Sequence, residues 1–215
     1  MVQRFNKDSL KPLFYPALLS ALMILFFILV RINVLSDISF VLFPRSPKYI
    51  YGIITSPFGH GDFMHLFGNL FAFLPLSYLL FYLYKKDAKL VFVSLWIVTG
   101  FLVWVFARPV FHIGASGVVY ALQAFILCSG ILKGRADMMA IAGLCIILFG
   151  TGFYFGMLPV QEGISWESHL LGFLAGIGLS FVFLNKGPKN KRKSKRAEHH
   201  DLYHQFDHRH KEQLD

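Results

Sequence analysis

The feature that most constrains this chain is a series of six long apolar stretches that contain almost no charged residues. Each stretch holds about 18 to 22 residues, and a helix that rises ~1.5 Å per residue needs about 20 of them to cross a bilayer core. Because backbone groups in lipid must bond within their own segment, helices are the expected form. The sequence therefore predicts an all-α polytopic membrane protein with spans at residues 13–30, 63–84, 90–107, 115–132, 138–158 and 165–184.

The composition favours lipid over water as the solvent around these helices. Hydrophobic residues make up 55% of the 215 residues and charged residues only 15%, whereas soluble domains have roughly 25% charged residues. The two cysteines, Cys128 and Cys145, lie inside apolar stretches, which argues against a disulfide framework or a cysteine metal site. We expect neither a metal nor a cofactor.

Lysines and arginines are concentrated on one side of the predicted membrane. If the chain crosses six times, most of them fall on the side of the two termini, so the positive-inside rule predicts that both termini are cytoplasmic, at the plasma membrane if the protein is bacterial. The expected organisation is a cytoplasmic N-terminal segment (1–12), one six-helix domain (13–185) and a basic, His-rich, disordered cytoplasmic tail (186–215).

The formal net charge of +9 is then explained by topology and by the tail. Nucleic acid is not an expected partner. The tail follows the last span directly, so anionic lipid is the partner that its positive charge favours.

Polar residues at membrane depth are costly and are therefore usually functional. Here they lie near the starts of three spans that all begin on the outer side: His60, His65 and Asn69 at the second span, Ser116 at the fourth and His169 at the sixth. Residues that are far apart in sequence thus fall at one depth on one face of the membrane. We interpret this convergence as a functional site.

Small residues follow the polar ones at helical spacing. Gly172 and Gly176 share a helix face with His169, and Gly117 begins a similar stripe after Ser116. In lipid, small residues allow two helices to approach closely. The two stripes predict a contact close enough for the imidazole of His169 to reach the hydroxyl of Ser116.

Three segments resemble the rhomboid family of intramembrane serine proteases. Gly114-Ala115-Ser116-Gly117 resembles the family's G-x-S-G nucleophile motif, residues 55–69 its second-helix signature, and residues 168–172 with Gly176 its sixth-helix signature. The resemblance extends from about residue 49 to residue 184. It implies a six-transmembrane-helix rhomboid-like bundle that hydrolyses peptide bonds in or next to the transmembrane segments of other membrane proteins.

The resemblance also implies a role for each site residue. Ser116 would be the nucleophile and His169 the general base and acid, because a serine hydroxyl is a weak nucleophile until a base takes its proton. The side chains of His65 and Asn69, with the backbone N–H of Ser116, would stabilise the oxyanion. The supporting residues would be Tyr120, which stacks on the imidazole, together with Gly114, Gly117, Gly172, Gly176 and His60, the last bracing the outer loop.

Two other functions stay open at this point. One is an inactive rhomboid-like protein that binds membrane segments, and the other is a small transporter. The chain also departs from the family, because Tyr51-Gly52 stands where rhomboids often have Trp-Arg, which puts the anchoring of the first outer loop in doubt. Among the nearby residues, we expect Asp62 to cap the second span, Glu167 to lie in the first turn of the sixth, and His112 to be a solvated loop histidine.

Overall fold

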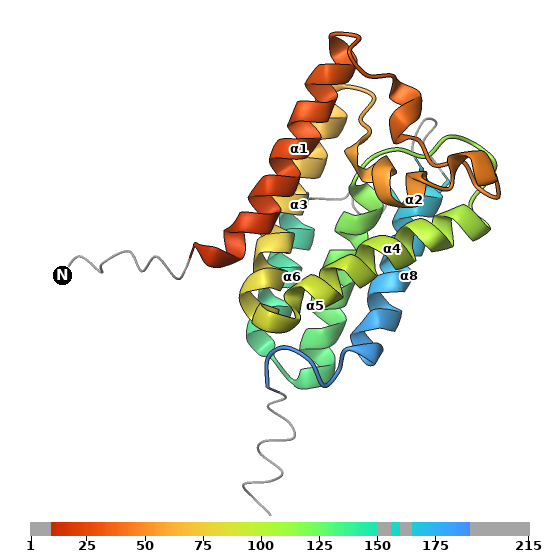
Figure 1. The fold of residues 1–215 in the computed structure, drawn as a ribbon. Helices are drawn as coiled ribbons and strands as arrows, with labels where there is room; N and C mark the ends of the chain where they lie inside the picture. Colours follow the sequence, from red (N-terminus) through yellow and green to blue (C-terminus); the bar gives the residue numbers. More distant parts are fainter. Residues whose placement is uncertain (1–9, 150–155, 160–164, 190–215) are drawn as a thin grey trace, which may run out of the picture.

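The protein is a bundle of helices in which most of the membrane-length segments pack around a central one (Figure 1). The computed structural model describes residues 10–149, 156–159 and 165–189. Over these residues the secondary structure is helical apart from one isolated β-bridge between Leu42 and His112. The α-helices are α1 (Phe14–Arg31), α2 (Gly52–Thr55), α3 (Phe63–Tyr84), α4 (Ala88–Phe106), α5 (Ser116–Lys133), α6 (Ala136–Phe149) and α8 (Trp166–Val182).

The long helices lie where the hydropathy of the sequence predicts them. The bounds of α3 coincide with the predicted span 63–84, and those of α1, α4, α5 and α8 differ from prediction by one or two residues. The described part of α6 ends at Phe149, so the rest of the predicted span 138–158 lies largely outside the described residues. Most of the predicted tail, 190–215, lies outside them as well.

The chain is a multi-pass membrane protein. In the described part of the chain, three helical stretches are long and apolar enough to cross a bilayer, namely Lys11–Arg31, Phe63–Phe106 and Ser116–Lys133, while Trp166–Val182 is apolar but shorter. The 44-residue stretch Phe63–Phe106 contains both α3 and α4, which are separated by a break at Lys85, where φ is +48°. Asp62 caps α3 as predicted, because its carboxylate accepts the backbone N–H of His65 at 2.8 Å.

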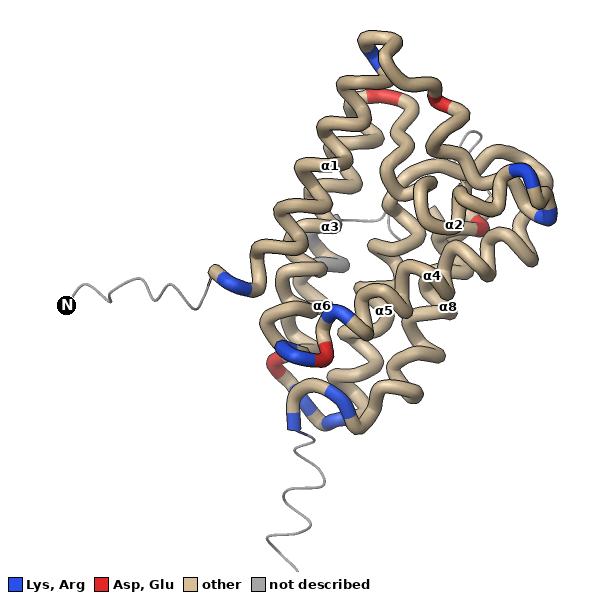
Figure 2. Tube along the Cα trace, viewed as in Figure 1, with Lys and Arg blue, Asp and Glu red and all other residues tan. Residues whose placement is uncertain are grey.

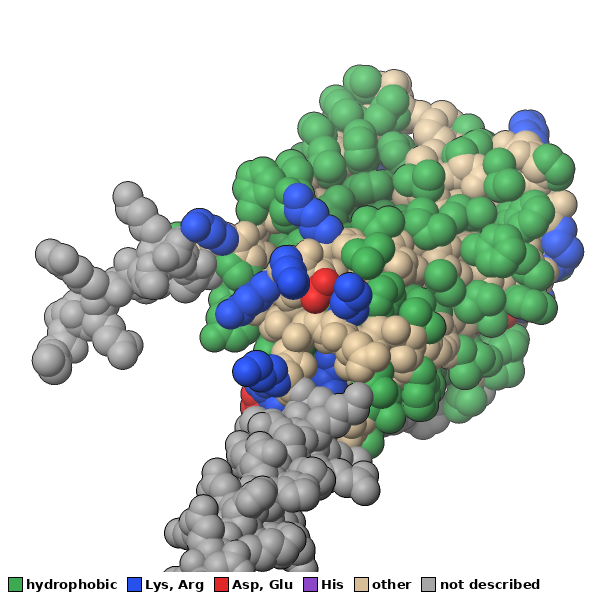
Figure 3. Space-filling view, turned by 60° about the horizontal axis from the view of Figure 1, so that its bottom comes forward, with side chains coloured by type: hydrophobic (Ala, Val, Ile, Leu, Met, Phe, Trp, Pro, Cys, Tyr) green, Lys and Arg blue, Asp and Glu red, His purple; other side chains and the backbone are tan. Residues whose placement is uncertain are grey.

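The distribution of charge matches a protein that spans lipid. Acidic and basic residues gather toward the two ends of the bundle (Figure 2), and large apolar side chains such as Phe63, Phe67 and Phe71 are exposed on its sides. Figure 3 shows hydrophobic side chains over a broad surface, with one group of lysines and arginines near the grey segments and others at the opposite edge. A water-soluble monomer rarely exposes so large an apolar surface.

Helix α5 lies at the centre and brings the site residues together. It contacts α3, α4, α6 and α8, with its most extensive contact on α8. An added Cβ at Gly172 would collide with the carbonyl of Gly117, and one at Gly176 would collide with the carbonyl of Ala121. The backbones of α5 and α8 therefore touch, as the small-residue stripes predict.

The segment between α1 and α3 is anchored without a Trp-Arg pair. Arg45 reaches the C-terminal end of α4, where its Nη1 donates to the carbonyls of Val105 (2.9 Å) and Ala107 (2.8 Å). These carbonyls belong to the end of a helix, where the partial charge is negative and intrahelical partners run out. The Tyr51 hydroxyl donates to the Ile38 carbonyl at 2.7 Å. The loop that precedes the site is thus fixed to the bundle by residues other than the family's usual pair.

Candidate active site

Ser116 and His169 form a hydrogen-bonded pair between α5 and α8. Ser116 is the first residue of α5, and its Oγ lies 2.7 Å from Nε2 of His169. The other ring nitrogen, Nδ1, lies 2.7 Å from the carbonyl oxygen of Gly156. A carbonyl only accepts, so Nδ1 carries the hydrogen and Nε2 presents its lone pair to the serine hydroxyl. This is the arrangement in which an imidazole takes a proton from serine.

The partner of Nδ1 was not found by sequence reasoning. The sequence shows no acidic residue obviously placed to orient His169, and among the described residues the backbone carbonyl of Gly156 lies at this nitrogen. A backbone acceptor has no signature in the side-chain pattern. The short described segment 156–159, which precedes α8, therefore supplies the third member of the arrangement.

Gly114 brings His65 and Asn69 close to the turn that carries Ser116. Its φ is +101°, a conformation that favours glycine. An added Cβ there would lie 2.6 Å from Nε2 of His65 and 3.5 Å from Nδ2 of Asn69. Asn69 is 5% exposed and donates one of its two amide hydrogens to the His65 carbonyl at 2.9 Å. Side-chain nitrogens of both residues thus lie beside the Gly114 peptide, two residues before the serine.

Tyr120 lies face to face with His169. The ring centroids are 4.4 Å apart, and the planes differ by 13°. Tyr120 is one helical turn after Ser116 on α5, so the same helix presents the hydroxyl and the aromatic wall of the imidazole. The structure thus has the stacked arrangement that the resemblance implies.

In the part of the chain that the structure describes, His60 touches the site through another histidine. Its ring packs edge to face on the ring of His65 at 5.1 Å, and its Nδ1 lies 3.3 Å from the Phe58 carbonyl. The side chain is 7% exposed. Burial, together with the neighbouring His65 ring, lowers the pKa of His60 to about 4. Its contacts place it in the wall behind His65, away from the Ser116–His169 pair.

The prediction that His112 is solvated is wrong. His112 is 2% exposed, and its backbone exchanges two hydrogen bonds with Leu42. Its Nε2 lies 3.0 Å from the Arg108 carbonyl and its Nδ1 2.5 Å from Oγ of Ser165. Partners on both ring nitrogens make its burial tolerable, and burial lowers the pKa of the imidazole. Loop position alone suggested solvent, because these partners come from distant parts of the sequence.

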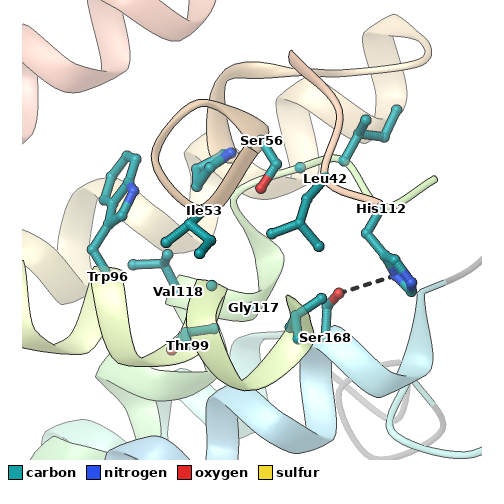
Figure 4. Close-up of a pocket in the computed structure, with 14 residues that line it drawn as sticks. Leu42, Ile53, Ser56, Trp96, Thr99, His112, Gly117, Val118 and Ser168 are labelled. Carbon is teal, nitrogen blue, oxygen red and sulfur yellow. Dashed lines mark hydrogen bonds between the residues drawn. The ribbon is translucent and has the colours of Figure 1, made fainter. Parts of the chain in front are cut away.

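A small cavity lies behind the serine turn (Figure 4). Its volume is about 20 Å³, enough for one water molecule. Gly114 and Gly117 form part of its wall, and the hydroxyl-bearing residues Ser56, Thr99 and Ser168 line it as well. The Thr99 hydroxyl is buried without a hydrogen-bond partner among the described residues. Most of the wall is apolar, so these few hydroxyls are the groups that a water molecule in the cavity would bond.

Metal ligands do not gather in the described part of the chain. Over residues 10–149, 156–159 and 165–189, no group of three or more His, Cys, Asp or Glu residues could hold a metal ion. The chemistry that these residues offer is that of a serine, a histidine and hydrogen-bond donors.

Comparison with known proteins places the chain in a family. Residues 47–186 match the model of the Rhomboid domain. Uncharacterized proteins of Mycobacterium bovis and Mycobacterium tuberculosis are each 29% identical over 163 residues, which cover 72% of this chain and 67% of the relative. A protein of Acanthamoeba polyphaga mimivirus, named there as a candidate rhomboid protein, is 28% identical over 144 residues, or 64% of this chain and 78% of the relative. The family match covers more than half of the chain, from the loop before α2 to the end of α8, and we conclude that this protein is a member of the rhomboid family.

Proposed function

We propose that this protein is an intramembrane serine endopeptidase that cuts the transmembrane segments of other membrane proteins, or the residues next to them. The observation that carries the proposal is the 2.7 Å contact between Ser116 Oγ and His169 Nε2. The Gly156 carbonyl fixes the tautomer that makes this nitrogen a base. Membership of a family that includes serine proteases supports the same reaction.

In the proposed mechanism, His169 takes the hydroxyl proton as Ser116 attacks the carbonyl carbon of the scissile bond. The negative charge develops on the carbonyl oxygen, toward which His65, Asn69 and the Ser116 backbone N–H direct hydrogens. The imidazolium then gives its proton to the leaving amine, which leaves an ester on Ser116. Water adds to the ester, His169 takes its proton, and collapse of the intermediate releases the acid and restores the serine.

The site needs water inside a membrane protein, and the cavity behind Gly117 supports such a supply. Its largely apolar wall contains the Thr99 hydroxyl, which has no partner among the described residues. A single water bound there would lie behind the turn that carries the nucleophile. Polar residues buried in protein rather than in lipid make such a wet pocket tolerable at membrane depth.

The proposal includes an orientation for the bundle. Six crossings with both termini in the cytoplasm put the start of α5 and of α8, and therefore the catalytic pair, near the outer face. We propose residues 13–185 as one protease domain. The expected substrate is a transmembrane helix that unwinds locally so that a backbone carbonyl can reach Ser116, and anionic lipid is the proposed partner of the basic tail.

The two alternatives have less support. An inactive membrane-segment binder would not need a base aligned on a serine, and this chain keeps that pair. A transporter needs a polar path through the bundle. Buried polar side chains do occur further along α5, but Gln123 donates to the Ala142 carbonyl and Lys133 to the Lys186 carbonyl. Side chains that are tied to the backbone in this way favour helix packing over permeation.

Labelling with a fluorophosphonate tests the proposal, because this reagent reacts with an activated serine. The purified full chain should be labelled, and labelling should be lost in Ser116→Ala and in His169→Ala. Ser77→Ala is the control, since Ser77 is a buried serine on another helix whose hydroxyl donates to its own helix, at 2.6 Å from the Phe73 carbonyl. Labelling that persists in folded Ser116→Ala, or its absence in the folded wild type, would contradict the proposal.

A further inference from the structure

We propose that Arg108, His112, Ser165 and Glu167 form a clamp that positions His169, and we call this set the α8 clamp. The inference rests on the proposed function, because it assigns these residues a role in the alignment of the catalytic base. They come from two places: the loop 107–115 between α4 and α5, and the first turn of α8 with the residue before it.

The first half of the clamp is an ion pair. Both Nε and Nη2 of Arg108 donate to the carboxylate of Glu167, the second bond at 3.2 Å. The carboxylate side chain is only 7% exposed, whereas the Arg108 side chain is 57% exposed. Arg108 approaches the carboxylate from the surface. If the pair broke, the negative charge of Glu167 would stay buried without a partner, which is costly. Two parallel bonds fix direction as well as distance.

The second half is a chain of hydrogen bonds that runs from His112 through serine hydroxyls. The Arg108 carbonyl can only accept, so Nε2 of His112 carries the hydrogen and donates to it at 3.0 Å. Its Nδ1 is then an acceptor, and the Ser165 hydroxyl donates to it at 2.5 Å. The Ser165 oxygen accepts in turn from Ser168 at 2.5 Å. Figure 4 shows His112 and Ser168 facing each other across the end of the cavity.

The clamp replaces a cap that α8 lacks. Ser165 occupies the N-cap position of α8, but its side chain makes no capping bond to the helix. An N-cap serine normally accepts a backbone N–H of the first turn. Here the hydroxyl is turned toward His112 instead. The start of α8 is therefore fixed by the loop 107–115 and not by a capping bond of its own.

The same loop leads directly into the nucleophile. The loop that binds Ser165 and Glu167 continues through Gly114 to Ser116, and Glu167 is two residues before His169. One short segment therefore fixes both the serine and the helix that carries the base. Loosening the clamp should move Nε2 relative to Oγ without unfolding α5 against α8, because the glycine contacts further along those helices remain.

The test measures inactivation by the fluorophosphonate at several concentrations, which separates the maximal rate constant from the reagent's apparent binding constant. We expect Glu167→Gln to lower the rate constant about tenfold, since displacements of an ångström or less cost up to ~10² in rate. The binding constant and Tm should change little. The matched control is Asp137→Asn. This substitution removes another carboxylate that accepts two bonds from an arginine, in this case Arg135, which lies beyond the far end of α5.

His112 provides a second, independent pair of variants. In His112→Asn, the amide oxygen can take the place of Nδ1 and accept the Ser165 hydroxyl, whereas His112→Leu removes the acceptor. The Asn variant should keep most of the wild-type rate constant and the Leu variant should lose about tenfold. A packing role alone would not separate them in this order, because Leu suits a buried site better than Asn.

The outcomes separate this inference from the proposed function. Wild-type labelling with unchanged rate constants in Glu167→Gln and His112→Leu would overturn the clamp and leave the protease proposal standing. A decrease that merely follows a lower Tm, or one as large in Asp137→Asn, would also overturn it. Absence of wild-type labelling in folded protein would instead overturn the proposed function, and the clamp with it.

Discussion

The stacking of Tyr120 on His169 allows a test of whether one side chain fixes the orientation of the imidazole. With the rings stacked at 4.4 Å, rotation of the imidazole is restricted on one face. Tyr120→Leu should lower the rate constant for fluorophosphonate labelling about tenfold, because the ring becomes free to turn away from Ser116. Tyr120→Phe keeps the aromatic face and should stay within about threefold of wild type, a small fraction of the ~10² that misplacement can cost. Equal rate constants for the Leu variant and wild type would show that stacking does not position the imidazole.

His60 makes the stability of the protein depend on pH. Burial lowers its pKa from 6.5 to about 4, so between these values the folded protein keeps His60 neutral while the unfolded chain binds a proton. The unfolded state then binds more protons, and stability falls as the pH is lowered from about 6.5 toward 4. The loss should be about 3 kcal/mol from this residue, at ~1.36 kcal/mol per pKa unit.

The measurement is the thermal unfolding of the protein in detergent across this pH range, with His60→Asn as the comparison. Asn can keep the bond from the Nδ1 position to the Phe58 carbonyl, but it does not titrate. The variant should therefore show a flatter dependence of Tm on pH. His112, whose pKa is also lowered by burial, leaves a remaining slope of the same sign. A slope identical to that of wild type would contradict this assignment to His60.

At the scale of elements, the contact between α5 and α8 depends on two glycines of one helix face. Gly172→Ala would press a methyl group against the Gly117 carbonyl, and overpacking of this kind costs about 1–3 kcal/mol. Gly178 is the matched control on the same helix, since an added Cβ there meets nothing within 4 Å. Gly178→Ala should be neutral or stabilising, because alanine favours a helix by about 0.5–1 kcal/mol over glycine.

Thermal unfolding and labelling of the two alanine variants together check this contact. Gly172→Ala should lower both Tm and the labelling rate constant, because the methyl group separates the helices that carry Ser116 and His169. If Gly172→Ala and Gly178→Ala behave alike, the close approach of the two backbones is not what aligns the site.

The sequence predicts the long helices well because lipid requires each crossing to be a continuous apolar helix. The span 63–84 therefore matches α3 residue for residue. The segment 32–62 does not have to form a continuous apolar helix, so its structure is harder to predict. Its short helical turns are fixed by groups remote in sequence, such as the α4 carbonyls that Arg45 binds, and hydropathy carries no information about them.

Some features of the site can likewise be predicted from the sequence and others cannot. Ser116, His169, His65 and Asn69 stand out in the sequence because polar residues are rare at membrane depth. The Gly156 carbonyl and the buried environment of His112 do not, because both depend on partners brought by the fold. The role of Glu167 was predicted only as a favourable charge in the first turn, and its ion pair with Arg108 appears once the loop 107–115 is placed against α8.

The molecule as a whole has a polar site at one end of an apolar bundle. The start of α5 carries Ser116, and its other end carries Lys133, whose ammonium binds the carbonyls of Lys186 and Pro188 beyond α8. The Tyr84 ring lies beneath this ammonium at 4.9 Å. At the end of the bundle opposite the site, Lys133 thus ties α5 to the backbone that follows α8.

Hydrolysis of a polypeptide within a membrane is the reaction that the proposed function requires. The full chain is reconstituted in lipid vesicles with labelled single-span polypeptides that carry helix-weakening residues near one end of the span. We expect cleavage in or next to the span by wild-type protein, with a rate reduced at least about 10³-fold in Ser116→Ala and in His169→Ala. Cleavage that persists in folded Ser116→Ala, or none with any of these polypeptides by folded wild-type protein, would contradict the proposed function.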